Sequence, residues 1–251
     1  MNLILVDERD RVDSFSVALA NTRAAHLINV LRVAPGQTVR VGLLDGPFGV
    51  GTVQTVQDGQ VTLRCAFETE VPPRPRVDVL LALPRPKVMR RLWAQLAALG
   101  VGQIILTNAE RVERHYFDTH VLGDAFSRSL LIEGLQQARD TRLPAVSIHR
   151  QFRILIEDHL DGLFSDGLPL CADPTGATSI QATVSEQADR RVLMAIGPEG
   201  GWNAFELRLL EAHGFRLVGL GPRTLRVDTA CTALLAITHA ALQDHFGAGS
   251  S

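Results

Sequence analysis

The pattern of apolar and polar residues changes early in this 251-residue chain. Up to about residue 70, short runs rich in β-branched residues lie at 39–41, 49–53 and 61–64, with Asp-Gly turns between them. Such runs predict short antiparallel strands joined by tight turns, and one helical stretch at 21–31 precedes them. Because closing a small sheet hides its edges, we expect a small β-barrel here.

A proline-rich segment, Val71 to Arg76, follows this β-rich part. Its three prolines cannot join the interior of a sheet, and they favour extended chain. We therefore place a domain boundary here, with a first domain over residues 1–71 and a second over residues 72–251.

Beyond this linker, continuous apolar runs alternate with segments of helical period. Continuous apolar runs are typical of buried parallel strands, and alternation of strands with helices predicts an α/β layer structure. The predicted strands are 77–83, 103–107, 146–149, 168–172, 191–196 and 215–220, and the predicted helices are 86–99, 126–137, 203–213 and 229–245.

Two of the predicted helices carry particular expectations. Asn203 is a candidate N-cap with Glu206 at the capping-box position, and Phe205, Leu209 and Ala212 are predicted to face inward. The last helix is apolar on most of its faces, which predicts burial in the core or in a subunit interface.

Composition describes an ordinary globular protein, with 46% hydrophobic residues and a formal net charge of −2. The N-terminus lacks a basic region and a long apolar core, and no apolar run is long enough to span a membrane. We expect a cytoplasmic protein without a signal peptide. The three cysteines lack metal-binding spacing, so no metal is expected.

Basic residues gather between Arg74 and Arg91, where six stand against the single acid Asp78. This excess has two readings: a solvated helix face preceded by linker arginines, or a patch that contacts phosphates.

Two glycine-rich segments, Ile196–Trp202 and Gly219–Ala230, follow the last two predicted strands. Glycine lets backbone N–H groups approach a ligand closely, and open α/β sheets bind ligands at the carboxyl ends of their strands. P-loop, dinucleotide-binding, zinc-protease and hydrolase-elbow motifs are absent from the sequence.

Taken together, these two segments resemble the signature of the ribosomal RNA small-subunit methyltransferase E family, in the knotted SPOUT class. The family carries GPEGG-x-x-x-x-E followed by LG-x-x-(I/L)LR-x-E-T-A. Glu206 fills the first acidic position, and the matches in the second motif are Leu220, Gly221, Leu225, Arg226, Thr229 and Ala230. The departures are Thr224, and Val227-Asp228 where the family usually has Thr-Glu.

Three further segments are similar to the family. Residues 26–36 resemble H-(I/L)-x-x-V-L-R-x-x-x-G of its PUA-like domain, and residues 107–111 resemble its (S/T)-E-R segment. Residues 133–144 resemble A-x-E-Q-(S/C)-G-R-x-x-(V/L)-P, but Arg139-Asp140 replaces Gly-Arg. This departure suggests a divergent branch or a different target.

The resemblance implies a SPOUT α/β fold with a mostly parallel sheet, a trefoil knot near the C-terminus, a PUA-like N-terminal β-barrel and a homodimer. It places S-adenosylmethionine in the knot loops. The implied cofactor-binding residues are Leu170, Ala172, Ile196, Gly197, Pro198, Gly200, Gly201, Leu220, Gly221 and Leu225.

Two residues carry the catalytic expectation. Arg226 would stabilise the target base or its phosphate, and its alternative is an ion pair with Asp228 or Glu199. Glu199 would bond ribose or substrate, and its alternative is an acid favoured by a helix dipole. The RNA contacts implied are Arg32, Arg85, Lys87, Arg111, Arg139 and Arg142.

The activity implied is S-adenosylmethionine-dependent methylation of uridine N3 in 16S ribosomal RNA, at the uracil 1498 type of position, on the small ribosomal subunit. Two alternatives stay open. One is a SPOUT methyltransferase that acts on another RNA position, and the other is a non-catalytic RNA-binding protein of ribosome assembly.

Overall fold

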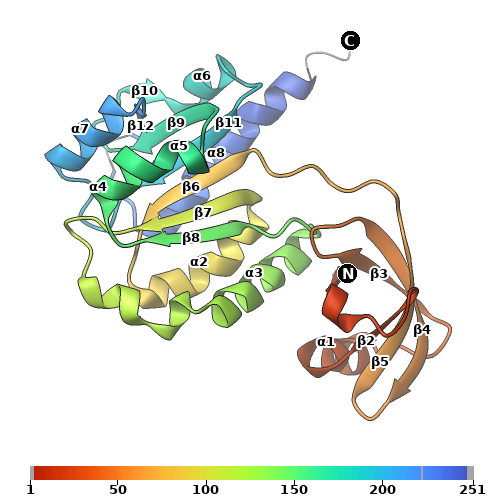
Figure 1. Cartoon of the computed structure of the whole chain (residues 1–251). Coiled ribbons are helices and arrows are strands. Elements are labelled where there is room, and N and C mark those ends of the chain that lie inside the picture. Colours follow the sequence, from red (N-terminus) through yellow and green to blue (C-terminus); the bar gives the residue numbers. More distant parts are fainter. Residues whose placement is uncertain (1–2, 222, 248–251) are drawn as a thin grey trace. The chain divides into compact units, whose positions relative to one another are not determined.

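The computed structural model describes residues 3–221 and 223–247. The chain divides into two compact units, each with its own sheet (Figure 1). The first unit contains the chain up to Arg74 together with Ile132–Leu143, and the second contains Pro75–Leu131 and the chain from Pro144 onward. The domain assignment made above, 1–71 and 72–251, stays a prediction.

The first unit holds a curled five-stranded sheet in the order β1-β3-β4-β5-β2. Side chains of β4 alternate between buried and exposed, as expected of a sheet with one face on a core. The three predicted strand regions are confirmed, whereas β1 and β2 had not been predicted. The strands are β1 (Ile4–Val6), β2 (Ser16–Leu19), β3 (Thr38–Leu43), β4 (Phe48–Gln57) and β5 (Gln60–Phe67).

Two irregular segments complete this unit. The predicted helix at 21–31 is an α-helical turn, α1 (Asn21–Ala25), followed by the π-helical η2 (His26–Val30), and a 3-10 turn, η1 (Glu8–Asp10), lies earlier. The segment 132–143 returns to the sheet: Thr141 Oγ1 donates to Gly46 O at 2.7 Å. No sequence pattern predicted that residues 132–143 pack with the first unit.

The second unit holds a seven-stranded sheet in the order β10-β12-β9-β11-β6-β7-β8, and every described pairing is parallel. All six residues of β6 are buried, as the continuous apolar run predicts. All six predicted strands are confirmed. The strands are β6 (Val77–Ala82), β7 (Val101–Thr107), β8 (Ala145–His149), β9 (Gly167–Ala172), β10 (Thr178–Ser179), β11 (Arg191–Ile196) and β12 (Arg216–Gly219).

Helices cover this sheet (Figure 1). They are α2 (Pro86–Ala98), η3 (Arg114–Asp118), η4 (His120–Leu122), α3 (Asp124–Ala138), α4 (Phe152–Ile154), η5 (Leu155–His159), α5 (Leu160–Leu163), α6 (Ile180–Ser185), α7 (Ala204–Ala212) and α8 (Val227–Gly247). Helix α8 packs on α2 and α6. It buries one stripe that includes Cys231, Leu234, Leu235 and Thr238. Within the described ranges, no helix is both long and apolar enough to cross a membrane.

The inward face of α7 differs from the prediction. The capping box is confirmed, since Asn203 and Glu206 bond each other's backbone N–H groups. However, the buried residues of α7 are Glu206 and Leu210, so the predicted inward stripe of Phe205, Leu209 and Ala212 is wrong, and Phe205 is 50% exposed. Glu206 faces inward because its Oε1 also accepts the N–H of Glu110 at 2.7 Å. Hydrogen bonds thus override hydrophobic period here.

Candidate functional site

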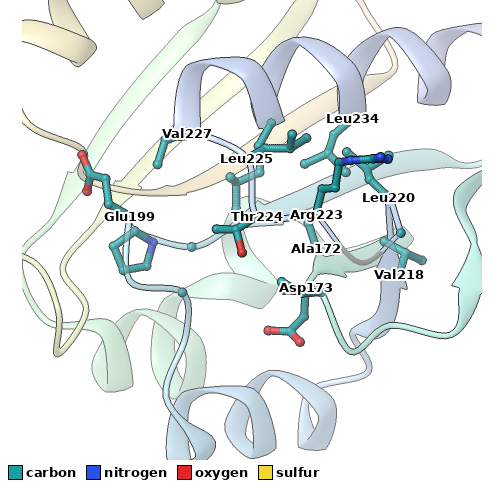
Figure 2. Close-up of a pocket in the computed structure, with 17 residues that line it drawn as sticks. Ala172, Asp173, Glu199, Val218, Leu220, Arg223, Thr224, Leu225, Val227 and Leu234 are labelled. Carbon is teal, nitrogen blue, oxygen red and sulfur yellow. The ribbon is translucent and has the colours of Figure 1, made fainter.

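One pocket forms where three neighbouring strands of the sheet end. Strands β12, β9 and β11 lie side by side, and their carboxyl ends lead into loops that enclose it together with the start of α8 (Figure 2). The carboxyl ends of parallel strands are where α/β sheets bind ligands. The lining residues are Ala172, Asp173, Pro174, Ile196, Gly197, Pro198, Glu199, Gly201, Val218, Leu220, Gly221, Arg223, Thr224, Leu225, Val227, Ala230 and Leu234.

Most of the predicted cofactor residues line this pocket. They are Ala172, Ile196, Gly197, Pro198, Gly201, Leu220, Gly221 and Leu225. Leu170 does not line it, because it is fully buried inside β9 and paired on both sides. Gly200 does not line it either. A Cβ on Gly200 would lie 2.8 Å from Arg111 Cδ, so this glycine makes room for that side chain.

The pocket combines an apolar wall with a few polar groups. Leu220, Leu225 and Leu234 lie together beside α8 in Figure 2. Gly221 has a φ of +92°, and a Cβ added there would meet no atom within 4 Å. The pocket therefore needs glycine here for its backbone conformation and for its open space. Pro222, part of the predicted second turn, lies outside the described residues.

Asp173 is one of the polar groups of the lining, and it ends the segment 170–173 from which the family resemblance implies cofactor contacts. Its Oδ1 accepts the N–H of Thr175 at 2.8 Å, and its N–H donates to Val218 O at 3.0 Å. The turn after β9 is thereby fixed with a carboxylate in the pocket lining.

Helix α2 is tied to both glycine-rich segments. Glu199 Oε1 accepts the backbone N–H of Arg85 at 3.3 Å, where α2 begins without a side-chain cap of its own. Asp228 accepts a hydrogen bond from Arg91 at 2.7 Å. That bond is the main cause that holds the pKa of Asp228 below its ordinary value.

Arg226, the predicted catalytic arginine, lies in the turn just before α8. Its side chain is exposed, and its carbonyl accepts the N–H of Ala230 at 2.8 Å. Among the described residues neither Glu199 nor Asp228 pairs with it, so the predicted alternative of an ion pair is wrong. It does not line the pocket, whereas Arg223 does.

The six arginine and lysine residues expected to contact RNA fall into two groups. Arg111 and Arg142 hold the protein's own backbone: Arg111 donates to Gly200 O, and Arg142 Nε donates to Pro72 O at 2.5 Å. The other four, Arg32, Arg85, Lys87 and Arg139, are exposed, as Arg111 also is. Arg32 and Arg139 have positive φ angles of 50° and 60°.

The basic stretch from Arg74 to Arg91 is divided among several tasks. Arg76 donates to two backbone carbonyls, including Arg190 O at 2.9 Å, and Arg91 pairs with Asp228. Arg90 lies over the Phe126 ring at 5.9 Å. The single acid, Asp78, is buried against Arg191. Several of these positive charges are therefore engaged in contacts within the protein itself. In the part of the chain that the structure describes, no group of three or more His, Cys, Asp or Glu side chains could hold a metal ion.

Sequence comparison finds relatives along nearly the whole chain. A family model described as an RNA methyltransferase domain matches residues 72–239. The Ribosomal RNA small subunit methyltransferase E of Treponema pallidum is 29% identical over 247 residues, which cover 96% of this chain and 92% of that protein. The Ribosomal RNA small subunit methyltransferase E 1 of Borreliella burgdorferi is 25% identical over 239 residues, covering 95% and 97%.

Solved structures share the fold. The Ribosomal RNA small subunit methyltransferase E from Neisseria gonorrhoeae, crystallised bound to S-adenosyl methionine, has a TM-score of 0.74 and 20% identity and covers 96% of this chain and 97% of that one. A probable rRNA-methyltransferase from Porphyromonas gingivalis has a TM-score of 0.75 and 20% identity, covering 98% and 100%. The predicted SPOUT α/β class with its small N-terminal β module is therefore confirmed.

Proposed function

Because the chain belongs to the RNA methyltransferase domain family, we propose that it transfers a methyl group from S-adenosylmethionine to N3 of a uridine in 16S ribosomal RNA, at the uracil 1498 type of position. The resemblance to the ribosomal RNA small-subunit methyltransferase E family is confirmed by the relatives from Treponema and Borreliella. The observation that carries the proposal is the convergence of three strand ends on one pocket, where eight of ten predicted cofactor residues meet.

The pocket residues fit such a cofactor. Leu220, Leu225 and Ile196 offer apolar surface to an adenine ring. Residues 223–225 form neither helix nor strand, so their backbone groups are available to a ligand. Asp173 places a carboxylate where ribose hydroxyls or an amino group can donate to it. The relative from Neisseria was crystallised with this cofactor.

When bound, S-adenosylmethionine supplies an electrophilic methyl group on a sulfonium. The chain must then hold the cofactor, exclude water and stabilise the anion that uracil forms as N3 loses its proton. We assign the last task to the guanidinium of Arg226, because a fixed positive charge favours the anion. Glu199 braces the first glycine-rich turn against α2, and its second oxygen is assigned to ribose or substrate.

The target is proposed to be 16S ribosomal RNA within the assembled small subunit, and the names of the relatives refer to ribosomal RNA of the small subunit. Residues 1–71 are proposed to help grip the RNA, through Arg32 among others. Arg139 is exposed and remains a proposed RNA contact. A homodimer in the cytoplasm belongs to the same proposal, and light scattering of the purified protein tests the dimer.

The decisive experiment is methyl transfer from labelled S-adenosylmethionine to small subunits from a strain deleted for the gene, with the product mapped by nuclease digestion and mass spectrometry. A single N3-methyluridine in 16S RNA is the expected result. Label at another RNA position would favour the alternative SPOUT target that Arg139-Asp140 and Val227-Asp228 keep open. Cofactor binding without transfer to any ribosomal substrate would favour an assembly protein.

A further inference from the structure

A second hollow surface lies beside the carboxyl ends of β7 and β8. Two adjoining hollows share four lining residues there, one extending to the start of α7 and the other to the end of β8. We call this surface the arginine–phenylalanine groove and define it by Asn108, Arg114, Arg150, Phe152, Arg153 and Phe205. None of these residues has a role in the cofactor pocket described above.

Phe205 gives the groove an exposed aromatic ring. Its side chain is 50% exposed, because the buried position beside it on α7 is taken by the carboxylate of Glu206. Phe152 also lines the groove but is buried, and its ring centroid lies 5.3 Å from that of Trp202.

Polar groups in the groove are left ready for a ligand. Asn108 Oδ1 is buried and accepts no hydrogen bond from any described residue. The side chain of Arg114 is exposed and has no ion-pair or hydrogen-bond partner within residues 3–221 and 223–247. A buried acceptor without a donor costs free energy that a bound donor would recover.

Three arginines and two carboxylates, Glu110 and Glu206, line the groove. Arg150 and Arg153 pair with Asp118 and Glu157 at the surface, and such exposed pairs exchange easily for another anion. Glu206 also lines the groove, but its carboxylate is occupied by the N–H groups of Asn203 and Glu110. The exposed carboxylate in the lining is that of Glu110, against three arginines.

The first glycine-rich turn connects the lining of the cofactor pocket with that of the groove. Arg111, three residues before Arg114, donates to Gly200 O in the first glycine-rich turn. The same turn leads through Asn203 into α7, which carries Phe205. An RNA strand whose target base enters the cofactor pocket would therefore run past this turn and reach the groove.

We propose that the arginine–phenylalanine groove binds one nucleotide of single-stranded RNA next to the target uridine. Its base stacks on Phe205, its edge donates a hydrogen bond to Asn108 Oδ1, and its phosphate lies on Arg114. An exposed aromatic ring beside arginines that can contact a phosphate is the combination that single-stranded nucleic acid selects. This inference rests on the proposed function and names a subsite for its substrate.

The test compares Phe205→Ala and Arg114→Ala with the wild-type chain in fluorescence anisotropy, using a labelled single-stranded RNA that carries the target sequence. Phe205→Ala should bind about tenfold more weakly, since one stacked base is worth roughly that factor. Phe205→Trp should restore binding. Arg114→Ala should reduce the slope of log affinity against log salt by about 0.7, the loss of one phosphate contact.

Arg216→Ala is the matched control. Arg216 is an exposed arginine of the same unit, at the opposite, amino end of β12, where it pairs with Glu186 at 3.6 Å. Its RNA affinity should equal that of the wild type. Thermal melting and calorimetric titration with S-adenosylmethionine should give the same values for all four variants, which separates groove effects from misfolding and from the cofactor pocket.

The outcomes separate this inference from the proposed function. Methylation by the wild type with unchanged RNA affinity in both alanine variants would overturn the groove while leaving the function. Weaker RNA binding in both variants, with no methylation by the wild type, would support the groove and reject the function. Unchanged binding to naked RNA but weaker binding to small subunits would mean that the groove contacts a ribosomal protein, and would overturn the proposal.

Discussion

The two edges of the seven-stranded sheet use their polar residues differently. At the carboxyl edge, the loops after β9, β11 and β12 leave regular structure and surround a pocket. At the amino edge, Asp78 of β6 is fully buried and paired with Arg191 of β11. Burial raises the pKa of Asp78 to about 6, although Arg191 lowers it.

This difference shows why a perturbed carboxyl group is not by itself evidence of an active site. Carboxyl ends of parallel strands open toward a shared space, where loops can vary and bind. The amino edge is where strands enter the sheet, and a charged pair there ties two strands together. Changes at the carboxyl edge should therefore alter binding and turnover, and changes at the amino edge should alter stability.

The largest expected effect comes from Gly221→Val at the carboxyl edge. Gly221 has a φ of +92°, which a β-branched residue adopts only with strain, and its side chain would project into the pocket. We expect S-adenosylmethionine affinity to fall by more than about 100-fold, measured by isothermal titration, since both the turn and the space change.

Gly214→Val separates strain from function in that experiment. Gly214 follows α7 with a φ of +85°, and a Cβ there would also meet no atom within 4 Å, yet it does not line the pocket. Both variants should lose stability, but only Gly221→Val should lose affinity for S-adenosylmethionine. Equal loss of cofactor binding in the two variants would mean that general destabilisation is the cause.

The next effect distinguishes the two arginines of the second glycine-rich segment. Arg226→Ala should lower single-turnover methyl transfer by about 100-fold, the usual loss for one charge-stabilising donor, with cofactor affinity nearly unchanged. Arg223 lines the pocket, so Arg223→Ala should instead weaken cofactor binding. Calorimetry and single-turnover assays measure both. Loss of cofactor binding in Arg226→Ala with RNA affinity intact would contradict the role assigned to Arg226.

At the amino edge, Asp78→Asn should change stability rather than activity. The folded pKa of Asp78, about 6, is above its ordinary 3.8, so its stabilising contribution is present below pH 4 and is lost as pH rises through 6. The Asp78→Asn variant carries no ionisable group at this position, so its stability does not fall over this pH range. Its free energy of unfolding should therefore gain up to ~3 kcal/mol on the wild type between pH 4 and pH 7.

Urea unfolding at a series of pH values measures this difference. Arg191→Gln is the companion variant: without the cation, the pKa of Asp78 should rise further and the loss of stability with pH should extend to higher pH. A constant difference between Asp78→Asn and the wild type across the series would contradict the linkage. Methyl transfer at a temperature where each protein is folded should stay unchanged.

Sequence patterns predicted most strands and helices because the residues buried in those elements follow the periodicity of apolar residues in the sequence. The parallel strands are buried on both faces and read as unbroken apolar runs, as in β6 and β11. The prediction failed at β1 and β2, whose three and four residues are too few to show a period. It also failed at α7, where paired hydrogen bonds to Glu206 decide which face is inward.

The cofactor pocket was predictable because glycine-rich turns follow neighbouring strands and carry a family signature. The fate of the arginines was not predictable. Arg111 and Arg142 bond backbone carbonyls that are about 90 and 70 positions away in sequence, and no local pattern encodes such distant partners. Phe205 and Asn108 were missed for the same reason, since exposure and unpaired burial exist only in the folded chain.

The smallest effect tests the tie between α2 and the start of α8. Arg91 and Asp228 are a partly exposed pair, with side chains 48% and 21% accessible, so Arg91→Ala should cost less than about 1 kcal/mol of stability. The pKa of Asp228 should rise toward its ordinary value, because the Arg91 hydrogen bond is the main cause of its depression. Stability that Asp228 contributes above its unfolded pKa would then be lost at a less acid pH.

Because Asp228 lies two residues after Arg226, methyl transfer by Arg91→Ala should fall a few-fold while cofactor affinity stays constant. Arg90→Ala, which removes the neighbouring arginine over Phe126, is the control. If Arg90→Ala and Arg91→Ala slow methyl transfer equally, the charge of α2 matters and the tie to Asp228 does not.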